Sequence, residues 1–435
     1  MKKYVVVASL AVMAQGTMAQ SGTNSPYSQF GLGMLADQST GFNRGMNGLA
    51  QGFREHNQLN SLNPASYSSI DSLTFIFDVG ISGQTSNFRE GNRKLNANNS
   101  NFEYAVAGFR AFKHLGVSFG LLPYTNIGYS YSTSVDVGDN ANTISYSSYS
   151  GSGGIHQAYL GLGWEPLRNF SIGVNGSYLY GEMNRSVVNS YSNTAANTLT
   201  KSYSADVRSY KIDFGVQYQF KISAKDNIVL GATYGLGHKI GGKPSVSIIS
   251  HNSQTSISDT AAYPSVGATA LKLEIPATLG IGFTIDHLQQ VKLGFDYNLQ
   301  KWSDVDAPIL STDENGKTTY SMVSGQYKNR HKFTLGAEVC PEENGRSFFN
   351  RIHYRAGLSY ATPYYYIGKQ DGPKEISASL GFGIPIVNSY NNRSILNISG
   401  QWVRQDASGF IKENTFRINI GLTFNERWFA KWKVE

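Results

Sequence analysis

One short motif in this chain has the residue types of a nucleophilic active site. Residues 116–120 read G-x-S-x-G, a pattern that in hydrolases exposes a serine at a sharp turn between a strand and a helix. Here, however, the apolar residues Leu115, Val117 and Phe119 alternate through the motif. Such alternation predicts a strand that continues through Ser118, so the serine does not lie at a turn and the motif predicts no hydrolase.

Two other patterns that could carry chemistry are incomplete. Gly31, Gly33 and Ala36 resemble a dinucleotide-binding loop, but no hydrophobic strand precedes them. The 8 His residues are scattered without an H-x₃-H pair, and Cys340 is the single cysteine, which excludes a multi-thiolate zinc site and an intramolecular disulfide. We therefore expect a protein that is not an enzyme and that has no catalytic residues, no metal and no cofactor.

The composition is unusual for a cytosolic enzyme. Of 435 residues, 15% are charged and 13% are aromatic, and there are 46 Gly. The hydrophobic fraction of 40% indicates a folded chain, and the net charge of +7 is too diffuse for a nucleic-acid partner.

The first nineteen residues have the pattern of a secretory signal peptide. Lys2 and Lys3 are followed by a short apolar stretch over 4–14, and small residues precede the expected cleavage after Ala19. The stretch is too short for a transmembrane helix, which needs about 20 apolar residues. A buried N-terminal strand is the alternative. The sequence therefore predicts an exported protein.

The remainder of the chain alternates between apolar and polar or small residues, as residues 212–220, 291–299 and 416–424 show most clearly. This period predicts strands with one apolar face. We expect fourteen, near 73–82, 103–111, 115–135, 155–164, 169–181, 207–220, 226–238, 276–286, 290–302, 329–340, 351–361, 374–385, 394–405 and 414–424.

The links between these strands are alternately short and long. Those at 112–114, 165–168 and 287–289 are short, whereas those at 83–102 and 182–206 are long and rich in Ser, Asn, Thr and Gly. An even number of long strands with such links is typical of an antiparallel transmembrane β-barrel. A soluble sandwich or propeller also gives alternation, but the strand lengths, the aromatic residues near strand ends and the signal peptide favour the membrane barrel.

Glycine is frequent on the polar face of the predicted strands, for example at 231, 294, 336, 357 and 421. Either the wall makes room for something inside the lumen, or glycine relieves curvature in a tilted barrel; both interpretations remain open. Residues 20–72 have no strand periodicity and are the nearest candidate for a plug. Asp296, Glu338, Arg355 and Arg417 are predicted to face inward, where charges usually pair with one another or with a plug.

Several short motifs resemble the long-chain fatty acid transporter (FadL/TodX) family of outer-membrane proteins. They are Asn63-Pro64-Ala65 before the first strand, LEIPATLGIG at 273–282, YNLQKWSD at 297–304 and, resembling the Bacteroidota-type branch, NSPYSQFGLG at 24–33. The tail WFAKW at 428–432 departs from barrels that stop at a terminal Phe.

The resemblance implies a fourteen-stranded barrel with an N-terminal hatch that passes hydrophobic molecules to a lateral opening in the wall. It assigns Asn63, Pro64 and Ala65 to the hatch; an ordinary Asn-Pro turn is the alternative. The implied domains are a signal peptide (1–19), a hatch (20–72), the barrel (73–424) and a periplasmic tail (425–435).

From these patterns we expect a multi-pass barrel in the outer membrane of a Gram-negative bacterium. The expected function is passive uptake of small hydrophobic compounds, either fatty-acid-like or aromatic. The expected partners are outer-membrane lipids, a hydrophobic ligand and other envelope proteins. The alternative is a non-transporting accessory barrel subunit of a larger outer-membrane assembly or secretion complex.

Overall fold

The computed structural model describes residues 22–138, 143–265, 267–343, 345–387 and 393–427. The predicted signal peptide and residues 428–435 of the predicted tail lie outside the described residues. The last strand extends three residues beyond the boundary expected at 424.

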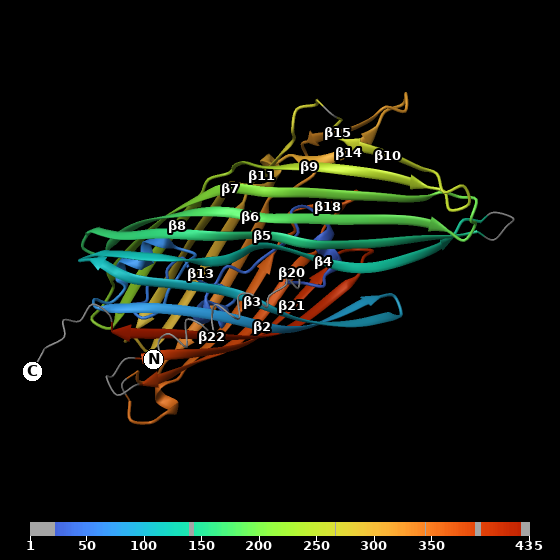
Figure 1. Cartoon of the computed structure of the whole chain (residues 1–435). Coiled ribbons are helices and arrows are strands. Elements are labelled where there is room, and N and C mark those ends of the chain that lie inside the picture. Colours follow the sequence, from blue (N-terminus) through green and yellow to red (C-terminus); the bar gives the residue numbers. More distant parts are fainter. Residues whose placement is uncertain (1–21, 139–142, 266, 344, 388–392, 428–435) are drawn as a thin grey trace, which may run out of the picture.

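The chain forms a closed antiparallel barrel of fourteen strands, as the sequence predicts (Figure 1). Strand β2 pairs with both β3 and β22, and this pairing closes the wall. The barrel strands are β2 (Thr74–Glu90), β3 (Arg93–Phe112), β4 (Leu115–Asp136), β5 (Ile144–Leu167), β6 (Phe170–Tyr191), β7 (Thr198–Lys221), β8 (Asp226–Gly235), β12 (Thr278–His287), β13 (Val291–Gln300), β16 (Arg330–Val339), β17 (His353–Ala361), β20 (Lys374–Val387), β21 (Arg393–Asp406) and β22 (Lys412–Arg427).

The other elements lie inside the barrel, in its connections or, for β9 to β11, in an extension of the sheet beside β7. They are the strands β1 (Met34–Leu35), β9 (His238–His251), β10 (Ser258–Tyr263), β11 (Lys272–Ile275), β14 (Ala307–Thr312), β15 (Thr318–Val323), β18 (Tyr366–Ile367) and β19 (Gln370–Asp371), and the short helices η1 (Pro26–Gln29), α2 (Gly41–Arg44), η2 (Pro64–Ser69), η3 (Trp302–Asp304) and η4 (Phe349–Arg351). No helix in the described part of the chain is long and apolar enough to cross a membrane.

The prediction of long loops at 83–102 and 182–206 is wrong. The β2–β3 ladder continues to Glu90 and Arg93, and the β6–β7 ladder continues to Asn189 and Leu199. These residues are mostly Ser, Asn, Thr and Tyr, which can pair as strands in water but lack the apolar alternation that marks a strand in lipid. As a result β4 to β7 form a tall wall, whereas β8, β12, β13 and β16 have only 10 residues each (Figure 1).

Apolar side chains cover the outside of the barrel, where Phe214, Leu293 and Ile420 are 44%, 52% and 42% exposed. Aromatic residues bound this apolar band: on β5, Trp164 lies near the short turns and His156, which packs near Tyr180, lies eight residues away. At about 3.3 Å per residue, these eight residues span about 26 Å of tilted strand, which suits an apolar band about 25 Å tall.

Candidate functional site

The N-terminal segment, residues 22–72, lies inside the barrel against the inward-facing wall. Phe42, Met46, Leu49 and Phe53 form a buried cluster in which every member is at most 1% exposed. The two Phe rings pack with their centroids 5.9 Å apart. A segment of this length buries such side chains only against another surface, and here that surface is the barrel interior.

Glycines in the wall allow this close approach. A Cβ atom added to Gly116 would lie 1.8 Å from the carbonyl oxygen of Tyr67, and one added to Gly231 would lie 1.8 Å from that of Gln51. One added to Gly357 would lie 2.4 Å from the carbonyl carbon of Met46. At these positions, therefore, the glycine makes room for the segment inside the lumen.

The Asn63-Pro64-Ala65 motif lies near the barrel end that carries the short turns. Asn63 is extended (φ −132°) and its Oδ1 accepts a hydrogen bond from the Ala65 N–H at 3.2 Å, which caps the η2 helix. Its Nδ2 donates to the Gln51 carbonyl at 2.9 Å. The motif packs on Gly173 and Gly215 of β6 and β7. It thus joins two parts of the segment to each other and to the wall.

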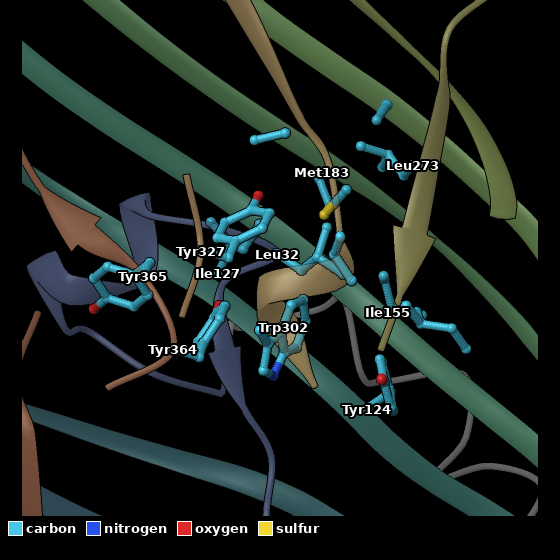
Figure 2. Close-up of a cluster of buried hydrophobic side chains, with 14 of the residues drawn as sticks. Leu32, Tyr124, Ile127, Ile155, Met183, Leu273, Trp302, Tyr327, Tyr364 and Tyr365 are labelled. Atoms are coloured by element: carbon cyan, nitrogen blue, oxygen red, sulfur yellow. The ribbon is translucent and has the colours of Figure 1, made fainter. Parts of the chain in front are cut away.

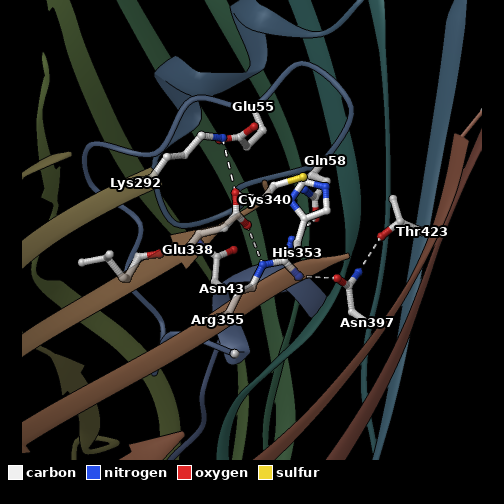
Figure 3. Close-up of polar contacts among 12 residues, drawn as sticks. Asn43, Glu55, Gln58, Lys292, Glu338, Cys340, His353, Arg355, Asn397 and Thr423 are labelled. Carbon is white, nitrogen blue, oxygen red and sulfur yellow. Dashed lines mark hydrogen bonds and ion pairs between the residues drawn. The ribbon is translucent and has the colours of Figure 1, made fainter. Parts of the chain in front are cut away.

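A buried ionic network anchors the segment on the opposite wall (Figure 3). Glu338 pairs with Arg355 at 2.6 Å and with Lys292 at 3.4 Å, and Lys292 reaches Glu55 of the segment at 2.5 Å. Arg355 also donates to Asn397 Oδ1 at 2.6 Å. Glu338 and Arg355 are at most 3% exposed at their side chains. Removing Glu338 would leave the buried Arg355 without the carboxylate that it pairs with.

Other wall carboxylates bind the segment directly. Asp296 Oδ2 accepts hydrogen bonds from the backbone N–H groups of Ala50 (2.6 Å) and Gln51 (3.0 Å). Glu103 pairs with Arg44 at 3.0 Å. The predicted inward orientation of Asp296, Glu338 and Arg355 is therefore confirmed, and all three bind either one another or the segment.

A cavity of about 270 Å³, lined by polar and apolar groups alike, lies between the segment and the barrel wall; we call it the polar cavity for its charged residues. Four acidic and four basic side chains line it: Asp37, Glu103, Asp213, Glu375, Lys211, Arg330, Lys332 and Arg417. Most are already paired, as Lys211 is with Asp213 and Arg330 is with Glu375 at 3.8 Å. Burial alone would raise the pKa of Asp37, but Arg44 and Lys332 outweigh it and lower that pKa to about 2.

An aromatic cluster lies toward the outer end of the barrel (Figure 2), and its member Tyr124 also lines the cavity. Trp302 is fully buried, its ring centroid 4.4 Å from that of Tyr364, which lies edge-on to Tyr365 at 4.8 Å. Tyr364 Oη donates a hydrogen bond to the Gly33 carbonyl, so the cluster also contacts the N-terminal segment. We call these residues, with Tyr27, Leu32 and Tyr327, the aromatic cap.

The wall has a seam between β3 and β4. Their ladder ends at Ala105 and Leu121, although β3 continues to Arg93 and β4 to Asp136. The N-terminal segment bridges the seam: Met34 and Leu35 of β1 pair with Asn126 and Thr125 of β4, and Asn24 Nδ2 donates to the Asn98 carbonyl at 3.1 Å. Residues on both sides of the seam also line the polar cavity.

The other motifs have structural roles. Ser118 is buried within β4, donates to the Ala107 carbonyl at 3.0 Å and lies 2.8 Å from the hydroxyl of Tyr159. Gly31 and Gly33 have positive φ angles (56° and 98°) in the turn beneath Tyr364. Cys340 is buried. Among the described residues, no group of three His, Cys, Asp or Glu side chains is placed to hold a metal.

Sequence reasoning missed the row formed by Lys292, Glu338 and Arg355. The three are direct cross-strand neighbours on β13, β16 and β17. Opposite charges on the polar faces of consecutive strands were the available signal, but it becomes specific only once the register is known. The aromatic cap lies mainly in connections, where no periodicity marks it.

The fold defines a closed fourteen-stranded β-barrel with the architecture of the FadL-type channels. The solved structures that it resembles include the CymD monoaromatic hydrocarbon channel (TM-score 0.58, 16% identity, 92% of this chain and 99% of that chain). They also include a Pseudomonas aeruginosa FadL homologue (0.59, 14%, 90% and 98%) and the P. putida toluene transporter TodX (0.59, 12%, 91% and 100%).

At these identities the likeness concerns the fold. No curated protein matches the chain. The BamG family model matches residues 1–435, so the chain belongs to the BamG family.

Proposed function

We propose that this protein is a non-transporting accessory barrel subunit of a larger outer-membrane assembly in a Gram-negative bacterium. The observation that carries the proposal is the filling of the lumen. Along the barrel axis a solute would meet the aromatic cap, then a charged cavity, then a segment bonded to the wall.

The cavity is a mixed passage for a hydrophobic solute. Eight charged side chains line it, four of each sign, beside apolar ones such as Leu122, Leu279 and Leu299, so an apolar molecule inside it would lie against charged groups over part of its surface. Most of these charges already have partners on the wall or the segment, which supports a structural role for them. Membership of the BamG family also supports an accessory role, because the family name has the form of a lettered subunit of an assembly.

Passive uptake of small hydrophobic compounds is the second candidate. It is favoured by the fold shared with a hydrocarbon channel and a toluene transporter, and by the seam between β3 and β4. Under this proposal the pairing of β1 with β4 would have to break, which would open the wall sideways into lipid.

A disulfide lock separates the two candidates. Leu35 and Thr125 are cross-strand partners, so L35C/T125C in a C340S background would tie β1 to β4 under oxidising conditions. An accessory subunit should retain its co-purifying envelope proteins in mild detergent whether locked or reduced, and vesicles containing it should take up toluene no faster than empty ones. Uptake that stops on oxidation and returns on reduction would instead establish transport. The single variants L35C and T125C are the controls.

A further inference from the structure

The barrel end with the short turns carries exposed apolar side chains in its connections. Each lies at or beside a turn and is at least 44% exposed: Leu73, Phe112, Leu167, Ile222, Leu288, Phe348 and Phe349. Exposed apolar residues at turn tips lose free energy in water and gain it where they meet an apolar phase.

These residues are distributed around the barrel rather than gathered on one side. They lie before β2 and in the β3–β4, β5–β6, β7–β8, β12–β13 and β16–β17 connections. Leu167 lies three residues beyond Trp164, which belongs to the aromatic boundary of the apolar band. A protein partner would cover one sector of such a ring. A planar membrane interface meets all of it.

The acidic and basic residues near these apolar side chains differ in whether they form ion pairs. Asp71 pairs with His56 at 2.7 Å, Glu165 with Arg54 at 2.6 Å and Asp226 with His287 at 2.6 Å, whereas the exposed Glu342 and Glu426 form no ion pair with the rest of the described chain. The same is true of five exposed basic residues, Lys113, Arg168, Lys221, Lys225 and Arg346. Five unpaired basic residues against two acidic ones leave an excess of positive charge at this end.

The β16–β17 connection lies against the outer wall of the barrel. Tyr354 alternates with the inward-facing Arg355, and its hydroxyl donates to the Phe349 carbonyl at 3.2 Å. The Tyr354 ring packs edge-on against Phe382, which is 47% exposed on the outside of the barrel. Phe349 thus lies next to the lipid-facing surface and not beneath the lumen.

We propose that this ring, the basic–apolar rim, binds anionic phospholipids of the inner leaflet. The apolar residues enter the boundary between headgroups and acyl chains, and Lys113, Arg168, Lys221 and Arg346 contact lipid phosphates. The arrangement follows the rule by which aromatic and basic side chains anchor membrane proteins at an interface. The proposal is independent of whether the barrel transports a solute.

The test compares lipid retention by the full-length barrel in nanodiscs of equal parts phosphatidylglycerol and phosphatidylcholine. After gentle extraction, native mass spectrometry counts the lipids of each class that stay bound. We expect the wild-type protein to retain phosphatidylglycerol in about twofold or greater excess. We expect the variant K113Q/R168Q/K221Q/R346Q to show no excess.

A matched control removes four exposed basic residues from the opposite end. The variant R93Q/K94Q/K317Q/K369Q has the same change in net charge and should keep the wild-type excess. Equal retention in the wild-type and rim variants would overturn the proposal. So would loss of a stoichiometric periplasmic protein from the rim variant without any change in lipid, which would make the rim a protein-docking surface.

A second measurement does not depend on the charge variants. Nitroxide labels on F112C and F349C in a C340S background should be relaxed more strongly by oxygen than by a water-soluble nickel chelate. A label on K317C at the opposite end should show the reverse order. Aqueous behaviour of both rim labels would contradict insertion of the rim into the interface.

Discussion

The inward-facing charges of this barrel act as pairs whose members come from different strands. Lys292, Glu338 and Arg355 stand side by side on β13, β16 and β17, and Lys292 extends the row to Glu55. Alternation alone predicts that the strand residues face inward. It cannot predict which of them meet, because that depends on the shear of the barrel.

We expect R355M to destabilise the barrel by about 3–5 kcal/mol, because Glu338 would lose its closest partner in a nearly water-free site. R404M removes an arginine from an exposed pair with Asp406 and should cost at most about 1 kcal/mol. Urea titration of both variants, followed by the gel shift between folded and unfolded barrel, measures the difference. Equal losses of unfolding free energy in the two variants would mean that the buried network stabilises the barrel no more than an exposed ion pair does.

We expect G231V to displace the N-terminal segment, because even a Cβ would overlap the Gln51 carbonyl. Overpacking of this kind costs about 1–3 kcal/mol. G83V is the matched control, since no atom lies within 4 Å of its added Cβ. Limited proteolysis should cut the N-terminal segment faster in G231V than in wild type, while G83V stays resistant. Equal resistance to proteolysis in both variants would show that the barrel wall, and not the N-terminal segment, moves to accommodate the valine.

At the scale of elements, strands were predicted correctly where their residues alternate between apolar and polar. They were missed where the strand continues with polar residues on both faces. The apolar alternation of β13 and β22 located both strands to within a few residues. The upper halves of β6 and β7 have Ser, Thr and Tyr on both faces, so their continuation was predicted as loop. The N-terminal segment was expected inside the lumen because it has no strand periodicity, precedes the first strand and faces a glycine-rich inner wall, and because the family resemblance implies a hatch.

Arginine at the lipid-facing positions Phe214, Val216, Leu293, Phe295 or Ile420 should cost about 2–4 kcal/mol near the bilayer midplane. At Gly294 or Asn419 it should act through steric conflict with the segment, since the added Cβ of Gly294 lies 2.9 Å from Leu49. Spin labels on the two sets should report lipid and a buried interior, respectively. Identical environments would contradict the barrel orientation.

For the molecule as a whole, the N-terminal segment takes part in filling the lumen at two levels. Residues 42–69 pack on the wall toward the short turns, whereas Tyr27 and Leu32 join Trp302 and Tyr364 in the aromatic cap at the outer end. Sequence reasoning anticipated a barrel with an N-terminal plug. The aromatic cap and the polar cavity were not predictable, because each is assembled from residues that are distant in sequence.

Deletion of residues 24–62 should leave a barrel that still inserts, because the lipid-facing alternation is untouched. It should raise planar-bilayer conductance, since glycine-lined walls of fourteen strands enclose more space than their own side chains fill. W302A in the full-length chain should leave conductance low if the segment alone is a sufficient barrier. Unchanged low conductance after the deletion would show that the outer connections seal the barrel alone.

The position of the N-terminal segment also constrains the order of biogenesis. Ser25 bonds to Glu413, and Arg44 donates to Asn419, contacts that span 388 and 375 residues. The residues that precede the barrel in the chain therefore wait for its last strand before they can reach their native partners, and contacts of such separation form slowly. Until the barrel closes, an apolar stretch containing Phe42, Met46 and Phe53 lacks the complete wall against which it is buried. We therefore expect this stretch to stay accessible to proteases in a C-terminally truncated chain.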